Sequence, residues 1–516
     1  MGLRNFIRRV FSPPRLARPE IAELADRVSN RLMQMRYAAA GDSEEMRTHW
    51  GQADAMDADA ANSLAVRKRA RERSRLEQGN NGYSIGTVRT NANYVVGRGP
   101  TLRMETGSST FNAMVEARWQ SWCKAVGFAR KLRVACKAKT GDGEAFLQIV
   151  SNPGIAHDVK LDLAELECDQ VSSPFIPYGE VGRIDGVRFD EFGNPTEYEV
   201  LAQHPGGLWS GYANEATRVP ARFMCHWYQA DRPRQHRGMP ECVSTLNLFG
   251  QGRRYREAVI AAAETAADFA AMLEMDAGND GPDEVRPFSS LPIERRMLVA
   301  TPAGGKISQL KAEQPPTTYD TFNRQIVSEE ARPLSMSYSI AACDSSGNSF
   351  SGTQNDHLIF YQGIDAEGRS DCELQVLDKV FSVWFSLAAH VYGWAVPDSP
   401  APRHEWGWPP MPQVDAQMAA DADKAELAIG VPPSVIADRR GADFEDWVRI
   451  GAADYGITED EYRAKLLGVN FVKAGAPAPA EKDGESKGEE AERKPDGPPP
   501  APSRNGHGRP RVGAQR

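Results

Sequence analysis

Hydrophobic and polar positions alternate along the chain between residues 140 and 230. Val159, Leu161 and Leu163 are separated by Lys160 and Asp162, the period of two that a half-buried β-strand shows. Further on, hydrophobic residues in 187–189 and 198–200 flank a Gly-Asn-Pro turn, which predicts a β-hairpin. This region is therefore expected to form antiparallel sheet in an α+β fold.

The pattern changes after Pro240 to one that is typical of a long helix. Residues 241–276 contain no proline and include the alanine-rich run AVIAAAETAADFAAMLEM, which has a high helix propensity. About thirty-five residues at roughly 1.5 Å each predict a helix of about 50 Å. Its many alanines let other helices approach closely, so such a helix suits an assembly better than a lone monomer.

Turn residues dominate the next segment, 277–316, where prolines recur and two adjacent glycines occur, so short strands and turns are expected there. A second helix is predicted for 317–341. It starts with a capping-box pattern from Thr317 to Asp320 and is kinked or stopped by Pro333.

A small, polar and flexible loop is predicted for 343–353. Another capping box, Thr353 with Asp356, predicts that a helix resumes at 354, with interruptions at Gly363 and Gly368. The most apolar run, 381–396, is too short and too polar to span a membrane and predicts a buried core helix. The loop contributes seven candidate functional residues: Asp344, Ser345, Ser346, Gly347, Asn348, Ser349 and Ser351.

The C-terminal part divides into two regions. Residues 413–470 have the pattern of short helices with acidic faces. From 474 to 516 the chain is rich in proline, glycine, lysine and glutamate with almost no apolar residues, which predicts a disordered tail.

The composition is that of a globular protein, with 41% hydrophobic and 25% charged residues among 516. Lysine and arginine total 61 against 70 acidic residues, a net charge of −9, which disfavours a protein that grips DNA along its whole length. The seven cysteines form no CxxC pair, so a reducing cytosol is expected rather than a disulfide framework. The basic N-terminus has no signal-peptide pattern, and no stable membrane insertion is expected.

Basic residues gather in two further places. The run RKRARERSR, 67–75, favours a solvated helix face or a ladder of ion pairs between subunits, with a phosphate contact as the alternative. The turn RPRQHRG, directly before the long helix, contains Arg232, Arg234 and Arg237. These arginines suit a contact with phosphate or a neighbouring subunit, and a solvated surface loop is an equal alternative.

The enzyme motifs that this sequence suggests each lack a required residue. The GGK of 304–306 lacks the first glycine and the Ser/Thr of a P-loop, and GNSFSG of 347–352 lacks the glycine that a nucleophile elbow needs. Five possible metal ligands match no zinc-module spacing, and isolated side chains are the favoured interpretation: His204, Cys225, His226, His236 and Cys242. No catalytic residue, metal or cofactor is therefore expected.

Several segments, in order along the chain, resemble the lambda-type portal proteins of tailed bacteriophages. The resemblance spans most of residues 60–450. Where members of that family often place an arginine after the aromatic-Ser pair, here Phe350 and Ser351, this sequence has Thr353 and Gln354. The segments that carry the resemblance include GDGEAFLQIV (141–150), LAELECDQVSSP (163–174), DGVRFDEFGNPTEYEVLAQHP (185–205), RVPARFMCHWYQADRPRQHRGMPECVSTL (218–246) and AACDSSGNSFSGTQNDHLIFYQ (341–362).

The resemblance implies a domain organisation. Residues 1–240 would form a wing with an N-terminal arm, 241–276 and 317–342 two stem helices, and 277–316 a small α/β clip between them. Residues 343–353 would be a tunnel loop, 354–412 a kinked helix and the return of the chain to the wing, and 413–473 a helical crown.

The resemblance also implies a function. The protein would be a structural, non-enzymatic component of the virion, made in the host cytoplasm and placed at one capsid vertex as a ring of twelve subunits. Double-stranded DNA would be packaged and ejected through the ring. Its other partners would be the major capsid protein and scaffold, the terminase large subunit and a head–tail adaptor protein.

Two other classes of function stay open from the sequence. A DNA-processing or capsid-maturation enzyme would require a metal or nucleotide, which the failed motifs argue against. A monomeric binding protein with a helical scaffold would stay a monomer in solution.

Overall fold

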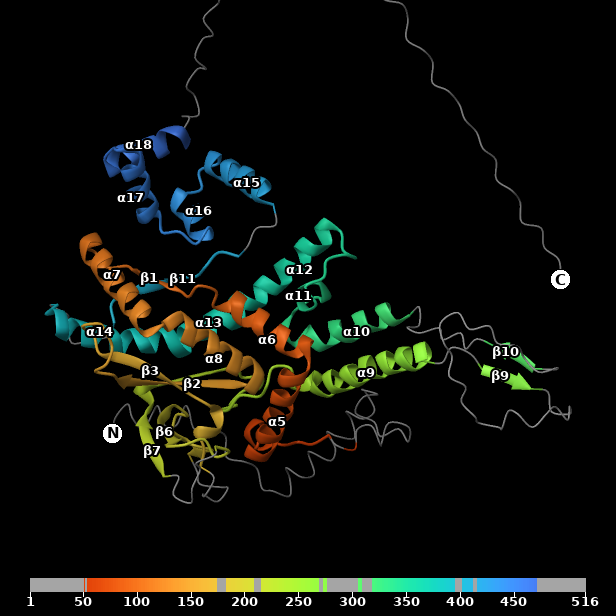
Figure 1. The fold of residues 1–516 in the computed structure, drawn as a ribbon. Coiled ribbons are helices and arrows are strands. Elements are labelled where there is room, and N and C mark those ends of the chain that lie inside the picture. Colours follow the sequence, from red (N-terminus) through yellow and green to blue (C-terminus); the bar gives the residue numbers. More distant parts are fainter. Residues whose placement is uncertain are drawn as a thin grey trace, which may run out of the picture.

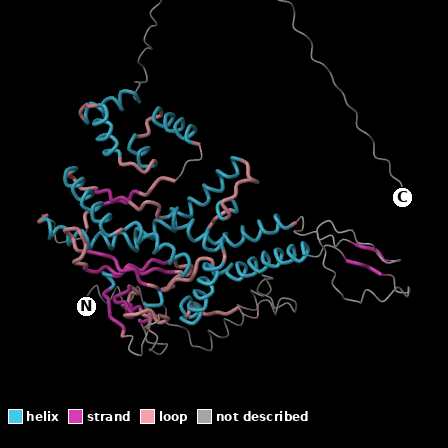
Figure 2. Tube along the Cα trace, viewed as in Figure 1, coloured by secondary structure: helices cyan, strands magenta, loops and turns pink. Residues whose placement is uncertain are grey.

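The computed structural model describes residues 51, 53–173, 182–207, 215–268, 272–275, 305–308, 318–394, 401–411 and 415–470. Most of the predicted N-terminal arm and clip, and the predicted tail of 474–516, lie outside these residues. The described chain combines helices with small antiparallel sheets, so the predicted α+β class is confirmed (Figures 1 and 2).

A layer of helices covers a three-stranded sheet in the middle of the molecule (Figure 1). The sheet has the order β3-β2-β8 and pairs antiparallel throughout, and α8 packs on β2. The elements that build this part are α4 (Ala58–Ala61), α5 (Leu64–Asn80), α6 (Gly82–Val95), α7 (Ser109–Val126), α8 (Phe128–Asp142), β2 (Glu144–Ser151), β3 (Leu161–Leu166), η2 (Cys168–Gln170) and β8 (Met224–Tyr228).

Aromatic side chains from distant parts of the sequence meet in the main core. Trp119 of α7 lies edge-on to Trp384 at a centroid distance of 5.1 Å and to Phe381 at 5.6 Å. The indole of Trp122 is also buried and donates a hydrogen bond to the Leu161 carbonyl of β3 at 2.9 Å. The buried core helix predicted for 381–396 is thus confirmed as α14 (Asp378–Tyr392), although it ends at Tyr392, where Gly393 is the C-cap.

A second, four-stranded sheet holds the predicted hairpin. Its order is β4-β5-β6-β7, with Val187 paired to Tyr198. An isolated bridge between Val171 and Val200 joins it to the segment after η2. The strands are β4 (Arg183–Ile184), β5 (Val187–Phe189), β6 (Pro195–Leu201) and β7 (Ala216–Pro220), followed by η3 (Ala221–Phe223).

Two helices leave this body side by side, α9 (Leu246–Asp268) and α10 (Tyr319–Ala331) (Figure 1). The predicted helix of 241–276 is too long at both ends. The short η4 (Val243–Thr245) precedes α9, and the strand β9 (Met272–Met275) pairs with β10 (Gly305–Ser308) where the sequence predicted helix. The pairing with β10 therefore overrides the helix propensity of the residues around Met272.

The second predicted helix ends well before residue 341, and the cause is the proline that the sequence indicated. Pro333 lies in η5 (Arg332–Leu334), which terminates α10, and α11 (Tyr338–Ala341) forms a separate turn. The helix has its N-cap at Thr318, which makes no side-chain cap hydrogen bond, and Thr317, where the predicted capping box begins, lies outside the described residues.

One long helix runs from Phe350 to Tyr392 through two π-helical stretches. Its parts are α12 (Phe350–Gly363), η6 (Ile364–Arg369), α13 (Ser370–Cys372), η7 (Glu373–Leu377) and α14. A β-carbon on Gly368 would lie 2.8 Å from Val95 of α6. The predicted irregularity at Gly368 therefore coincides with a close approach of the two helices.

Four short helices form a separate group near the C-terminal end: α15 (Ala416–Ala428), α16 (Pro433–Arg439), α17 (Phe444–Tyr455) and α18 (Glu459–Asn470). This confirms the helices predicted for 413–470. β1 (Thr101–Met104) pairs with β11 (His404–Gly407) beneath the group, and an ion pair joins Arg103 to Asp438. Within the described residues, no helix combines the length and apolar character that a membrane span requires.

Candidate functional site

The predicted loop lies between α11 and α12 and exposes its polar side chains. Residues 345–351 are all exposed to solvent. The loop turns sharply at Cys343, whose φ is 53°, and the Asn348 amide donates to the Ser345 carbonyl at 3.1 Å. Six of the seven predicted loop residues are thus exposed, and Asp344 is half-buried.

The helix after the loop starts earlier than predicted. Ser349 is its N-cap, because the Ser349 hydroxyl accepts a hydrogen bond from the Gly352 amide at 3.2 Å. The predicted cap, Thr353, is already inside the first turn. Its amide donates to the Ser349 carbonyl at 3.0 Å, so the helix begins at Phe350.

A positive charge reaches the loop from another helix. Nη2 of Arg324 on α10 lies 3.3 Å from Oδ2 of Asp344 and 3.4 Å from Oγ of Ser346. The same guanidinium binds Asp320 at 3.0 Å and lies over the ring of Tyr338. Hydrogen bonds from Ser346, with Arg324 nearby, keep the pKa of Asp344 below its usual range.

Sequence reasoning missed Arg324. It lies 20 residues before Asp344, on a helix for which the sequence indicated only where it starts and where Pro333 interrupts it. The spacing of Asp320 and Arg324, four apart, is the one signal that marks a helical ion pair. Arg324 therefore brings a positive charge to the loop, and the carboxylates of Asp320 and Asp344 both pair with it.

The three arginines of the turn before α9 do not act together. Arg232 is exposed and donates to the Met56 carbonyl at 3.0 Å, and Arg234 is exposed with a φ of 62°. Arg237 is 0% exposed, so the predicted contact of this residue with phosphate or a neighbouring subunit is wrong. For Arg232 and Arg234 the contact stays a prediction.

Arg237 instead closes a buried ionic centre around Glu144, which begins β2. Its Nη2 lies 2.6 Å from Oε1 of Glu144 and its Nε lies 2.9 Å from Oε2. Arg71 of α5 makes a second ion pair with the same carboxylate, and Nε2 of His226 lies 3.0 Å from it. The backbone amide of Gly238 donates to Oε2 at 3.1 Å.

The carboxylate of Glu144 stays ionised because two arginines lie next to it. Burial alone would raise the pKa of Glu144, but Arg237 and Arg71 hold it well below the usual range. Burial lowers the pKa of His226 to about 4, so the imidazole is neutral near pH 7 and donates to Glu144. The helix of the basic run 67–75 therefore has a buried ionic face, and the solvated or intersubunit interpretation is wrong for Arg67 and Arg71.

The five candidate metal ligands do not meet within the described residues. His226 binds Glu144, His236 binds Asp59 at 2.7 Å, and burial raises the pKa of both Cys225 and Cys242 to about 12. His204 does lie near Glu167 and Asp169, with the ligand atoms within 4.8 Å of one another. Arg75 pairs with both of these carboxylates, which makes the group an ion-pair network.

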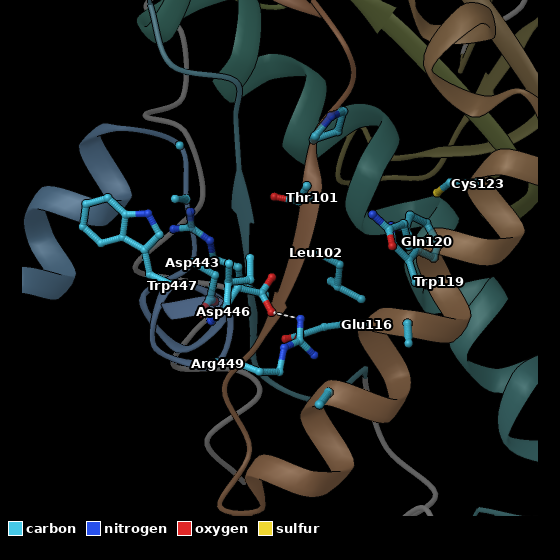
Figure 3. Close-up of a pocket in the computed structure, with 17 residues that line it drawn as sticks. Thr101, Leu102, Glu116, Trp119, Gln120, Cys123, Asp443, Asp446, Trp447 and Arg449 are labelled. Atoms are coloured by element: carbon cyan, nitrogen blue, oxygen red, sulfur yellow. Dashed lines mark hydrogen bonds and ion pairs between the residues drawn. The ribbon is translucent and has the colours of Figure 1, made fainter. Parts of the chain in front are cut away.

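A cavity of about 380 Å³ lies between α7 and β1 on one side and α17 on the other (Figure 3). Glu116 faces Asp443 and Asp446 there, and Arg449 pairs with Asp446. Burial raises the pKa of Glu116, and the two aspartates raise it further. The cavity has no nucleophile paired with a base among its described lining residues, so it does not form a catalytic constellation.

A family model described as "Phage portal protein, lambda family" matches residues 45–367. The chain belongs to the lambda family of phage portal proteins. It is therefore a structural protein of the virion, located at the portal vertex of the capsid as a head–tail connector. The family is structural rather than enzymatic, which supports the expected absence of an enzyme function.

No curated protein is significantly similar to this portal protein in sequence. Among solved structures, it is similar to a chain titled "Virion of native gene transfer agent (GTA) particle", with 14% identity, a TM-score of 0.40, and coverage of 72% of this chain and 93% of that one. Chains from the neck of an empty GTA particle and of a native one also match at 14% identity. Their TM-scores are 0.41 and 0.37, covering 72% and 70% of this chain and 93% and 91% of theirs.

Proposed function

We propose that this portal protein assembles into a ring of twelve subunits through which double-stranded DNA is packaged and later ejected, with residues 344–351 facing the DNA. The observation that carries the proposal is the exposed polar loop at the junction of α10, α11 and α12. The lambda-family model supports it, because its match to residues 45–367 includes this loop.

The chemistry of the loop suits a contact with DNA that must slide. Ser345, Ser346 and Asn348 offer hydrogen bonds to phosphate oxygens without a fixed positive charge. Each fully cationic contact with phosphate would add affinity and therefore friction. Arg324 supplies a cation whose charge Asp320 and Asp344 already share, so its attraction for phosphate is moderated.

The long helix after the loop offers a surface for a neighbouring subunit. Leu358 and Ile359 of α12 are each 58% exposed, while Phe360 between the helix and the core is buried. Exposed apolar residues also occur on both projecting helices, at Ile260 and Phe322. Burial of these side chains between copies of the chain would stabilise the ring.

The remaining partners follow from the same proposed arrangement. Within the clip predicted for 277–316, the structure describes the strand β10, which pairs with β9 beyond the ends of α9 and α10 (Figure 1). We assign this end of the molecule to the terminase large subunit during packaging and to the head–tail adaptor afterwards. The wing would contact the major capsid protein and scaffold.

The function of the loop is tested by adding negative charge to it. The variant with Ser345→Glu and Asn348→Glu keeps the helix cap at Ser349, so rings and procapsids should form normally. Repulsion of the phosphates should reduce packaged DNA several-fold in a nuclease-protection assay. Ser382→Glu, at an exposed position on α14, is the control and should package normally. Wild-type DNA content in the loop variant would contradict the proposal.

The ring contact is tested separately. Leu358→Asp together with Ile359→Asp should leave a folded chain that no longer forms rings, as measured by sedimentation. Phe192→Asp, at an 81% exposed position in the β5–β6 turn, should assemble like the unmodified chain. Normal rings from the α12 variant would exclude this surface as a subunit contact.

A further inference from the structure

A glutamate without a partner is buried at the root of the two projecting helices. Glu330 of α10 is 0% exposed, and neither of its carboxylate oxygens has a hydrogen-bond partner. The side chain points at α9, where a β-carbon on Gly252 would lie 2.8 Å from Oε1 of Glu330 and 3.1 Å from Ile326. Gly252 therefore leaves the space in which the Glu330 carboxyl group sits.

The cations nearest to Glu330 are engaged elsewhere. Arg253 of α9 binds Glu77 of α5, with its Nη2 3.1 Å from Oε1. Arg256, one turn from Gly252, donates to Asn323 of α10 at 3.3 Å and to Asn81 at 3.4 Å. Its guanidinium also lies 4.9 Å from the centre of the Tyr83 ring of α6. Arg256 thus ties both projecting helices to the α5–α6 junction.

The surroundings of Glu330 favour its neutral form. Its pKa is raised to about 7, chiefly by burial and to a smaller extent by Glu77, while Arg256 opposes the shift. A further titratable group nearby is the thiol of Cys242, whose pKa is raised to about 12 by its own burial and, to a smaller extent, by Glu241 and Glu330. An ionised carboxylate without donors is costly in a buried site, so ionisation of Glu330 must recruit a cation. The cation available without breaking the Arg253–Glu77 pair is Arg256.

We propose that Glu330 is a proton-controlled latch between α9 and α10. In its neutral form the helices pack as described here. When it ionises, it draws Arg256 away from Asn81 and Asn323, which loosens the tie between the helix pair and the α5–α6 junction. The proposed latch involves neither ring assembly nor DNA, so its test is independent of the proposed function.

The sign of the pH dependence follows from the raised pKa. A carboxyl group with a higher pKa in the folded chain than in the unfolded chain stabilises the fold at low pH, and this contribution is lost as pH rises from about 4.5 through about 7. Glu330→Gln keeps the shape of the side chain and cannot ionise. Relative to this variant, the unmodified chain should lose stability as the pH increases.

The experiment measures unfolding of the full chain between pH 5 and pH 8. The ratio of the unfolding equilibrium constants of the unmodified chain and Glu330→Gln should rise by tens of fold over this range, and amide exchange of α9 and α10 should follow it. Glu329→Gln removes an exposed charge from the adjacent position and should leave the profile of the unmodified chain unchanged.

A second variant keeps the test decisive if Glu330→Gln folds poorly. Arg256→Gln removes the cation that the ionised carboxylate would recruit, so the loss of stability with increasing pH should become steeper. Parallel pH profiles for the unmodified chain and Glu330→Gln, or an unchanged slope in Arg256→Gln, would overturn the proposal.

Discussion

Glu144 and Glu330 are both fully buried carboxylates, yet their surroundings are opposite. Glu144 accepts hydrogen bonds from two arginines, a histidine and a backbone amide, and its pKa lies well below the usual range. Glu330 accepts none, and its pKa is raised to about 7. Equal burial therefore produces a permanently charged centre in one place and a titratable group in the other.

The difference separates a fixed part of the molecule from an adjustable one. The Glu144 centre joins α5, β2, β8 and the turn before α9, segments that are far apart in the sequence. Gly143 and Gly238 approach so closely there that a β-carbon on Gly238 would lie 1.9 Å from the Gly143 carbonyl oxygen. The Glu330 site lies where the projecting helices leave this body, so a change in its charge would act at the base of α9 and α10.

The largest expected effect comes from removing the central acid of the fixed region. Glu144→Ala leaves the guanidinium groups of Arg71 and Arg237 buried without their shared partner, so we expect a loss of about 3–5 kcal/mol in the free energy of unfolding. Denaturant titration measures this loss. The control Glu191→Ala, at an exposed turn position, should cost less than about 0.5 kcal/mol. A loss below about 1 kcal/mol for Glu144→Ala would show that the centre is not what holds these segments together.

Acid should weaken the fixed region, the opposite of its effect at Glu330. Because the pKa of His226 is lowered to about 4, the unfolded chain binds a proton more readily and stability falls as pH drops from about 6.5 to 4. The contribution of His226 to this fall is about 3 kcal/mol at most. Comparing the pH profile of His226→Gln with that of the unmodified chain measures it. If the two profiles have the same slope in this range, His226 does not titrate as the structure indicates.

A smaller effect on the free energy of unfolding is expected from substituting Gly252, which packs against Glu330. Gly252→Ala places a methyl group against the carboxylate and Ile326, which should cost about 1–3 kcal/mol and outweigh the gain in helix propensity. Gly250→Ala, two residues earlier on α9, meets its nearest atom at 3.5 Å and should stabilise the protein by up to about 1 kcal/mol. Thermal unfolding of the two variants should therefore shift in opposite directions, and equal shifts would contradict the packing described here.

The smallest effect on stability is expected in the loop. The variant with Ser345→Glu and Asn348→Glu alters exposed side chains and should change the free energy of unfolding by less than about 0.5 kcal/mol. A markedly lower melting temperature would mean that the loop contributes to the stability of the fold rather than to a contact with DNA.

Much of the fold could be predicted from local patterns. The Gly-Asn-Pro turn between two hydrophobic segments predicted the hairpin of β5 and β6, the apolar run predicted α14, and Pro333 marked the end of α10. The predicted helix of 241–276 was wrong at its far end because the pairing of β9 with β10, across a separation of some thirty residues, outweighs local propensity. The cap at Ser349 was missed because Thr353 offered an equally regular pattern one turn later.

The sites were less predictable because they depend on contacts between distant residues. Arg237 meets Glu144 across 93 positions, and nothing in its basic turn distinguishes a buried arginine from the exposed Arg234 beside it. Arg324 reaches Asp344 from a different helix, and Glu330 is one of two adjacent glutamates that the sequence does not separate. Family resemblance identified the loop, but only the packing shows which charges surround it.

Electron microscopy of the purified protein tests whether this chain is a ring-forming portal protein. We expect ring-shaped particles with a central hole and, in end views, twelve-fold symmetry. Particles that are uniformly monomeric across protein and salt concentrations, with no rings at any of them, would contradict it.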